Sequence, residues 1–394
     1  MENRKVYLLI VSSFIFLLTG CWDQVPIEER GFVIGTTVDL ADKQESENYN
    51  LHATNQIVIP AGLGSAGQSG SSPTAYTNLS AKGKSLFEIS RKISTFTSRV
   101  PYYEHLKVIA VSEEVAKEPG LFASIMDAFI RDQEMRRSIK VIISEGEAHQ
   151  VLEVKTKTEK LPAIYINSIL EHSARSLAIV DAVKMGDIHQ FLLDRSSYAI
   201  PRVLVSDNKV KDNGVAVFQG YNNKMVGVLT GKEVKGLNLI KKKNQGGIIE
   251  FEIDDHLMIY EIQNTKSSIK IDVKDKDNIN ISIKIDAEGD IAEMFGSKTL
   301  LEPKRFKEIE KTISKKIEKL ANKSLEKAQK ELNADIFGFD TRLKQRHYDK
   351  WQKIKDDWQK GENLFANCTI TVSAEAIVRA TGAADKTKNK EMSE

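Results

Sequence analysis

Cysteine is almost missing from this sequence, which has only Cys21 and Cys368 among its 394 residues. If Cys21 carries another group, as its position suggests below, Cys368 has no partner within the chain. No disulfide framework then supports the fold, which must rest on ordinary hydrophobic cores. Cys368 lies in the β-rich run CTITVSAEAIV, where we expect a buried and unreactive thiol.

Motifs for catalysis and metal binding are missing as well. The seven histidines are scattered, and no two have the i, i+4 spacing of a zinc-binding helix. There is no H-E-x-x-H, C-x-x-C or G-x-S-x-G motif. Gly62–Gly67 has the letters G-x-G-x-x-G, but a Gly/Ser-rich stretch follows where a dinucleotide site needs a helix. We therefore expect no enzyme activity, no cofactor and no metal site.

An excess of one charge is also absent, since 57 Lys and Arg face 55 Asp and Glu, for a net charge of +2. This balance argues against a nucleic-acid-binding protein. Beyond the first twenty residues, no window of ~19 residues is apolar enough to span a membrane. The body of the protein is therefore expected to lie outside the bilayer.

The N-terminus, in contrast, carries a clear signal. Arg4 and Lys5 precede an apolar run of about 13 residues, Val6–Leu18, which is shorter than the ~20 residues of a membrane span. This is the layout of a secretory signal, and Leu18-Thr19-Gly20-Cys21 resembles the bacterial lipobox. The resemblance implies cleavage before Cys21 and a diacylglyceryl group on its thiol. An uncleaved anchor helix and an ordinary signal cut elsewhere stay open, and all three place the body outside the cytoplasm.

The next residue, Trp22, follows the proposed lipid attachment point directly. Trp is enriched at the level of lipid headgroups, because its ring is both apolar and polar. Trp22 is therefore predicted to lie at the membrane interface.

Hydrophobic spacing predicts two regions of different texture. Up to about residue 205, strands at 31–40, 51–59, 106–112 and 139–144 alternate with helical patterns at 85–100, 121–131, 164–180 and 184–193. After Gly214 the chain reads as short strands, then as two alternating strands at 268–273 and 279–289. A continuous apolar stripe predicts one long helix at 303–333, and residues 368–382 return to strand. The pattern indicates an α+β protein.

Two charged segments each allow two interpretations. Arg131, Asp132, Arg136 and Arg137 cluster at the end of a predicted helix; they form either a solvated face or a patch for a partner subunit. The long helix has ten basic and five acidic residues between Lys304 and Glu331. Its outer face is either simply solvated or contacts anionic lipid headgroups.

Trp351 and Trp358 are seven residues apart, so on a helix they would share one face. A tryptophan pair with this spacing belongs either to a core or to an interface with a partner.

Several segments together resemble the Ger(x)C family of spore germination lipoproteins. They are spread in order over residues 21 to about 382. The matching stretches are Cys21-Trp22-Asp23 with Glu28 and Glu29, GTTVD at 35–39, GKSLFE at 83–88, YEHLK at 103–107, Phe129–Asp132 with Arg136 and Arg137, GVAVF at 214–218, VGVL at 226–229, DIFG at 335–338 and WQKIKDDW at 351–358. Each stretch is short, and their order and span make the resemblance specific.

The resemblance implies a three-domain α+β extracytoplasmic body with mixed sheets and a long helix in the C-terminal domain. The division predicted along the chain is a signal peptide at 1–20, an N-terminal α/β-type domain at 21–205, a small β-rich middle domain at 206–255, a C-terminal α+β domain at 256–382 with the helix at 303–333, and a flexible tail at 383–394.

The resemblance also implies a role, that of the non-catalytic C subunit of a nutrient germinant receptor. Such a subunit is lipid-anchored to the outer face of the spore inner membrane of an endospore-forming bacterium, with two membrane subunits as partners. A second hypothesis is a lipid-anchored solute-binding protein that captures the nutrient itself. That hypothesis needs two similar α/β lobes around a cleft, and the β-rich second half argues against it.

Overall fold

The computed structural model describes residues 26–42, 49–64, 74–171, 176–241, 246–295 and 303–380. The predicted signal peptide (1–20), the proposed anchor residues Cys21 and Trp22, most of the Gly/Ser-rich loop and the predicted tail (383–394) lie outside these residues. Within the described part of the chain, no helix has the length and apolar character that crossing a membrane requires.

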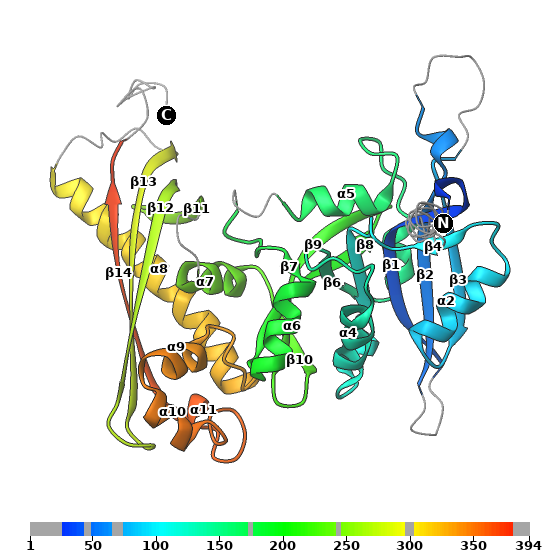
Figure 1. Cartoon of the computed structure of the whole chain (residues 1–394). Coiled ribbons are helices and arrows are strands. Elements are labelled where there is room, and N and C mark those ends of the chain that lie inside the picture. The colour runs from blue at the N-terminus through cyan, green and yellow to red at the C-terminus, as the bar shows by residue number, and fades with distance from the viewer. Residues whose placement is uncertain are drawn as a thin grey trace, which may run out of the picture.

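The first half of the chain builds a mixed sheet of ten strands (Figure 1), in the order β10-β9-β8-β6-β5-β1-β2-β3, with β4 added beside β1 and β7 beside β6. Strands β1, β5, β6 and β8 run parallel in its centre, and antiparallel strands extend it at both sides. The strands are β1 Arg30–Asp42, β2 Asn50–Val58, β3 Tyr76–Gly83, β4 Val100–Tyr102, β5 Val108–Ser112, β6 Lys140–Glu145, β7 Val183–Lys184, β8 Tyr198–Ser206, β9 Lys209–Gln219 and β10 Lys224–Leu229.

Helices cover both faces of this sheet, so its central strands are buried on both sides. In β5, Ile109 and Val111 join the core of one face, whereas Val108 and Ala110 join the core of the other. A parallel strand covered on both faces needs such a continuous apolar run. One face packs against α2 Leu86–Thr95, α3 Glu113–Lys117, α4 Leu121–Arg131 and α6 Met185–Asp194; the other packs against η3 Ala148–Leu152 and α5 Pro162–Ile169.

The second half builds a four-stranded sheet, in the order β11-β12-β13-β14. Its strands are β11 Gly247–Ile253, β12 His256–Val273, β13 Ile279–Met294 and β14 Thr369–Val378. Strands β11, β12 and β13 are antiparallel neighbours, and β14 runs parallel to β13. Its helices are α7 Lys232–Lys241, α8 Pro303–Glu326, α9 Phe339–Arg346, α10 Tyr348–Ile354 and α11 Leu364–Asn367.

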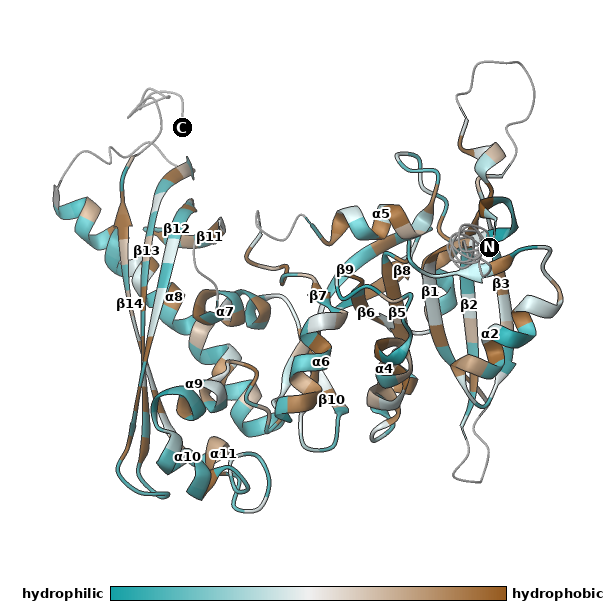
Figure 2. Ribbon diagram, viewed as in Figure 1, coloured by the Kyte–Doolittle hydropathy of each residue, from teal (hydrophilic) through white to brown (hydrophobic). Residues whose placement is uncertain are grey.

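The long helix α8 lies against one face of this sheet (Figure 1). Its stripe Ile309, Ile313 and Ile317 is fully buried against alternate residues of β13 such as Ile281 and Ile283. After Glu326 the helix widens into a π-helix, Lys327–Glu331. The long helix predicted over 303–333 is thus present, with a widened last turn. Figure 2 shows apolar residues concentrated on the central strands of the first sheet and polar residues along α9 and α10.

The two sheets are joined through α7 and α8. A Cβ on Gly236 of α7 would lie 2.1 Å from the backbone oxygen of Leu320 on α8, so only glycine allows the two helices to approach this closely. The side-chain amide of Gln219, at the end of β9, donates to the backbone oxygen of Leu332 at 3.0 Å. Val215 and Val217 of β9 share one hydrophobic core with α7, α8 and the second sheet.

The predicted α+β class with mixed sheets and a long C-terminal helix is therefore confirmed. The segment predicted as a middle domain, 206–255, contributes β9 and β10 to the first sheet and β11 to the second. The division of the chain into three domains stays a prediction.

Candidate functional site: a basic pocket at an open strand edge

The charged residues predicted to cluster at the end of α4 each contact a nearby residue. Arg131 binds Asp127 one turn earlier at 2.7 Å, and the carboxylate of Asp132 accepts the backbone N–H of Glu134 at 2.9 Å. Arg136 lies 3.7 Å from a Glu104 oxygen. Arg137 donates to the backbone oxygen of Gly186 at 3.3 Å and contacts His189. Arg131 and Arg136 are exposed, and their role toward a partner stays a prediction.

A buried carboxylate organises the region after α8. Asp335 is fully buried and begins the DIFG stretch. Its two oxygens accept five N–H groups at 2.8–3.2 Å, namely the backbone N–H groups of Phe337, Gly338, Phe339 and Asp340 and the indole N–H of Trp358. These backbone groups open helix α9, so the carboxylate satisfies donors that have no partner within the helix. Gly338 has φ +76°, a conformation that favours glycine.

Burial, together with the neighbouring charge of Asp340, raises the pKa of Asp335 to about 7. The N–H groups of Asp340 and Trp358 act in the opposite direction, because they favour the ionised form. Asp335 therefore holds the start of α9 with a group whose charge is sensitive to its surroundings.

The two tryptophans do not share one helix, so the arrangement expected from their spacing is wrong. Helix α10 ends at Ile354, and Trp358 follows in a turn that is held by Asp335. The rings still meet, with centroids 6.2 Å apart and planes at 74°. Trp358 is buried and also packs against Phe365, so it belongs to the core, whereas Trp351 is half-buried at the surface.

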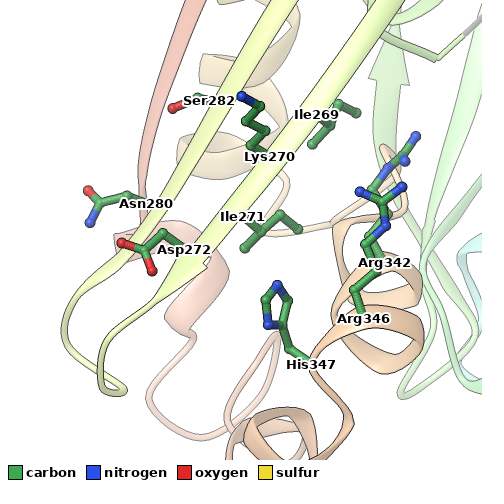
Figure 3. Close-up of a pocket in the computed structure, with 9 residues that line it drawn as sticks. All are labelled: Ile269, Lys270, Ile271, Asp272, Asn280, Ser282, Arg342, Arg346 and His347. Atoms are coloured by element: carbon green, nitrogen blue, oxygen red, sulfur yellow. The ribbon is translucent and has the colours of Figure 1, made fainter.

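Helix α9, fixed in this way, presents two arginines to a pocket of about 600 Å³ beside strand β12. Figure 3 shows Arg342 and Arg346 extending from α9 and His347 pointing toward Ile271. The residues lining the pocket are Ile269, Lys270, Ile271, Asp272, Asn280, Ser282, Arg342, Arg346 and His347.

Positive charge dominates this pocket. Within the described residues, neither Arg342 nor Arg346 has a carboxylate within 4.0 Å. Burial and then the charge of Arg346 lower the pKa of Arg342. Like charges four residues apart on a helix are unfavourable, so an anionic group that binds both would relieve the repulsion. The planar guanidinium suits carboxylates and phosphates, which it can bind through two hydrogen bonds.

The pocket lies where β12 loses its outer neighbour. Pairing with β11 ends at Ile262, so in the described part of the chain residues 263–273 have a strand on one side only. The backbone N–H of Lys274 donates to Asn278 across the hairpin, whereas the backbone oxygen of Val273 accepts from Lys350 of α10. Since successive residues of an antiparallel strand face opposite neighbours, the odd-numbered residues 267–273 direct their backbone groups to the open edge.

The other edge of the same sheet is covered. The outward N–H groups of Ala374, Ala376 and Val378 on β14 donate to side chains of α8, each at 3.0 Å. Their acceptors are Glu318, Ser314 and Glu310, spaced one helical turn apart. The helix thus occupies the positions that a further strand would take.

Sequence reasoning missed this site. The i, i+4 spacing of Arg342 and Arg346, with no acidic residue between them, was a usable signal. The open edge could not be predicted from the sequence, because the sequence of neither strand shows how many residues of β12 pair with β11.

Comparison with known proteins agrees with this architecture. The fold resembles one already solved: the crystal structure of the GerBC protein superposes with a TM-score of 0.59, at 20% identity, over 89% of this chain and 99% of that one. A family model described as spore germination protein N-terminal domain matches residues 23–205. A second, described as spore germination B3/GerAC like, C-terminal, matches residues 213–382.

Curated relatives match over nearly the whole chain. Spore germination protein YndF of Bacillus subtilis is 29% identical, covering 97% of this chain and 98% of the relative. Spore germination protein A3 of the same organism is 29% identical over 96% and 98%, and spore germination protein KC is 25% identical over 96% of each. The chain belongs to the Ger(x)C family of spore germination proteins.

Proposed function

We propose that this protein is a membrane-tethered, non-catalytic subunit of a nutrient germinant receptor, where it is needed for receptor assembly and the germination response. The observation that carries the proposal is the ordered match of both family models over residues 23–382. Its place is the outer face of the spore inner membrane, held by a diacylglyceryl group on Cys21. Two or three acyl chains give firm anchoring, since each buried CH₂ contributes ~0.8 kcal/mol.

The chemistry of the described residues supports a non-catalytic role. The thiol of Cys368, expected to be buried, is half-buried and donates to the backbone oxygen of Phe365 at 3.2 Å. Burial raises its pKa to about 12, so the thiolate that would act as a nucleophile is not formed at neutral pH.

The partners in this proposal are the two membrane subunits of the same receptor, and the docking site is the open edge of β12 with its basic pocket. An exposed edge can accept an extended segment through backbone hydrogen bonds. Arg342 and Arg346 then select a segment with acidic side chains. The partner surface predicted at Arg131, Asp132, Arg136 and Arg137 is a second candidate contact.

Lipid anchoring is tested with Cys21→Ala, which removes the acceptor thiol. We expect a folded protein that is lost from the membrane fraction of spores and no longer supports germination. Cys368→Ala is the matched control, because it removes the other cysteine and leaves the anchor intact. Intact mass and detergent partition report the lipid directly. Retention in the membrane together with normal germination of the Cys21→Ala strain would contradict tethering.

Direct capture of a nutrient is the second candidate function. The observation in its favour is a groove of about 1080 Å³ between the end of α6 and helices α9 and α10, lined among others by Arg195, Tyr221 and Trp351. Calorimetry of the whole chain with amino acids and sugars tests it. Micromolar binding, lost in Trp351→Ala, would favour a solute-binding protein over an assembly subunit.

A further inference from the structure

Three side chains far apart in the sequence meet on one face of the first sheet. Asp39 on β1 and His52 on β2 are directly opposite each other in the antiparallel register, so both point to the same face. The short helix η3 lies over β1 and brings His149 to the same place. Each of the three residues offers a ligand atom, and these atoms all lie within 4.8 Å of one another.

The carboxylate of Asp39 is fixed before any ligand arrives. It accepts the backbone N–H of Ala148 at 2.5 Å and that of His149 at 3.0 Å. Asp39 is only 6% exposed, and its Oδ2 lies 3.7 Å from Nδ1 of His149. The imidazole rings of His52 and His149 have centroids 5.9 Å apart. The group is therefore oriented and largely shielded from water on the carboxylate side.

Two imidazoles and a carboxylate are a donor set for divalent transition metals. Zinc binds histidine nitrogen and carboxylate oxygen at about 2.0–2.2 Å, and three protein ligands leave one position for water. A metal ion binds the neutral form of imidazole through a ring nitrogen. Because Asp39 is buried, a cation beside its carboxylate would offset the cost of holding a charge away from water.

Acidic side chains also lie near the second ring nitrogen of His149. Nε2 of His149 lies 3.7 Å from a Glu147 oxygen and 3.9 Å from a Glu153 oxygen, both exposed side chains. A carboxylate on the second nitrogen orients a metal-bound histidine and raises its basicity. His149 thus has one nitrogen on the side of Asp39 and the other on the side of these carboxylates.

We propose that Asp39, His52 and His149 bind a divalent transition-metal ion, with zinc as the first choice. The ion ties η3 to strands β1 and β2. Scanning the sequence for histidines four residues apart does not find such a site, because two of its ligands face each other across strands and the third comes from about 100 residues further on. The proposal replaces the sequence-based expectation that the chain has no metal site.

The alternative is that Asp39 only holds η3 in place and contacts His149, with no metal ion bound. The test uses the whole chain in detergent, carrying Cys21→Ser so that the N-terminal thiol does not bind the probe. The chelator-treated protein is titrated with Zn²⁺ while thermal unfolding is followed, and with Co²⁺ while visible absorption is followed. We expect one equivalent of Co²⁺ to give the absorption of a low-coordinate site and Zn²⁺ to raise the melting temperature.

The variants His52→Gln and His149→Gln each remove one ligand and leave the Asp39 contacts with η3 in place. Each should weaken Zn²⁺ binding by about tenfold or more. His256→Gln, an exposed histidine at the start of β12, is the matched control and should bind as the parent does. The absence of a Co²⁺ spectrum and of a Zn²⁺ effect in the parent would overturn the proposal. Equal binding by all three variants would do the same.

Discussion

The two edges of the four-stranded sheet differ in whether another element covers them. At β14, Glu310, Ser314 and Glu318 of α8 accept the outward backbone N–H groups. At β12, residues 263–273 pair with β13 on one side and have no strand on the other side among the described residues, where Arg342 and Arg346 lie beside them. Uncovered edges invite pairing with other chains, and proteins usually block them. This difference is the basis for proposing that the β12 edge accepts a partner segment.

The position of α9 beside the open edge depends on Asp335, so the largest effect is expected from Asp335→Ala. The substitution leaves five N–H groups without this acceptor, four of them buried, and should lower the free energy of unfolding by about 3 kcal/mol or more. Chemical denaturation measures it. A loss below about 1 kcal/mol would show that α9 does not rely on this carboxylate.

Asp335 also predicts a pH dependence. Its folded pKa of about 7 exceeds the unfolded value of about 3.9, so the folded state binds the proton more tightly. This contribution to stability is complete below pH ~4 and is lost as the pH rises through about 7. Relative to Asp335→Asn, which does not titrate, the wild type should lose stability between about pH 4 and pH 7 and change little above that. Parallel denaturation curves at the two pH values would contradict the assignment.

Two neighbouring serines test which backbone groups face the open edge. Ser268→Pro removes an N–H that points toward β13 and should cost about 2–3 kcal/mol. Ser267→Pro removes one that points to the open edge and should cost less than about 1 kcal/mol. We expect Ser267→Pro to fold and yet fail to retain the receptor partners in pull-down from spore membranes. The reverse order of stability would place the open edge on the other set of residues.

Removing the cover of the other edge should have an intermediate effect. The triple variant Glu310→Ala, Ser314→Ala, Glu318→Ala leaves three strand N–H groups without side-chain acceptors and should cost about 1–3 kcal/mol in total. It should also increase self-association in size-exclusion chromatography, because β14 becomes an open edge. Lys315→Ala, exposed on the same helix, is the control. A triple variant that stays monomeric would mean that α8 blocks the edge sterically, without needing these three hydrogen bonds.

The smallest effect on stability is expected at the basic pocket. Arg342→Gln with Arg346→Gln removes a like-charge pair and should change the free energy of unfolding by less than about 1 kcal/mol. Retention of the receptor partners and germination should nevertheless fall about tenfold or more, because a desolvated acid–arginine contact is lost. Lys315→Gln with Lys319→Gln on α8 removes the same charge elsewhere and controls for it. Normal partner retention in the arginine variant would exclude this pocket as a contact.

The sequence predicts many of the helices and strands, but not the contacts between them. The helix expected at 121–131 occupies Leu121–Arg131, because its apolar residues recur at helical spacing and bury one face. The apolar stripe of α8 could be predicted for the same reason. The register that sets Asp39 opposite His52 was not readable, since it depends on pairing between strands. The role of Asp335 was equally hidden, because its five donors are assembled only when Trp358 folds back onto it.

The parallel pairing of β13 with β14 has a consequence for how the protein folds. Ile283 meets Val372 across nearly 90 residues of chain, so this contact is strongly non-local. The sheet cannot close until β14 has left the ribosome, and before that α8 and β13 expose apolar surface that β14 later covers. A chain that stops short of Thr369 would therefore lose much more than one strand, and we expect it to be degraded rather than to accumulate as a shorter subunit.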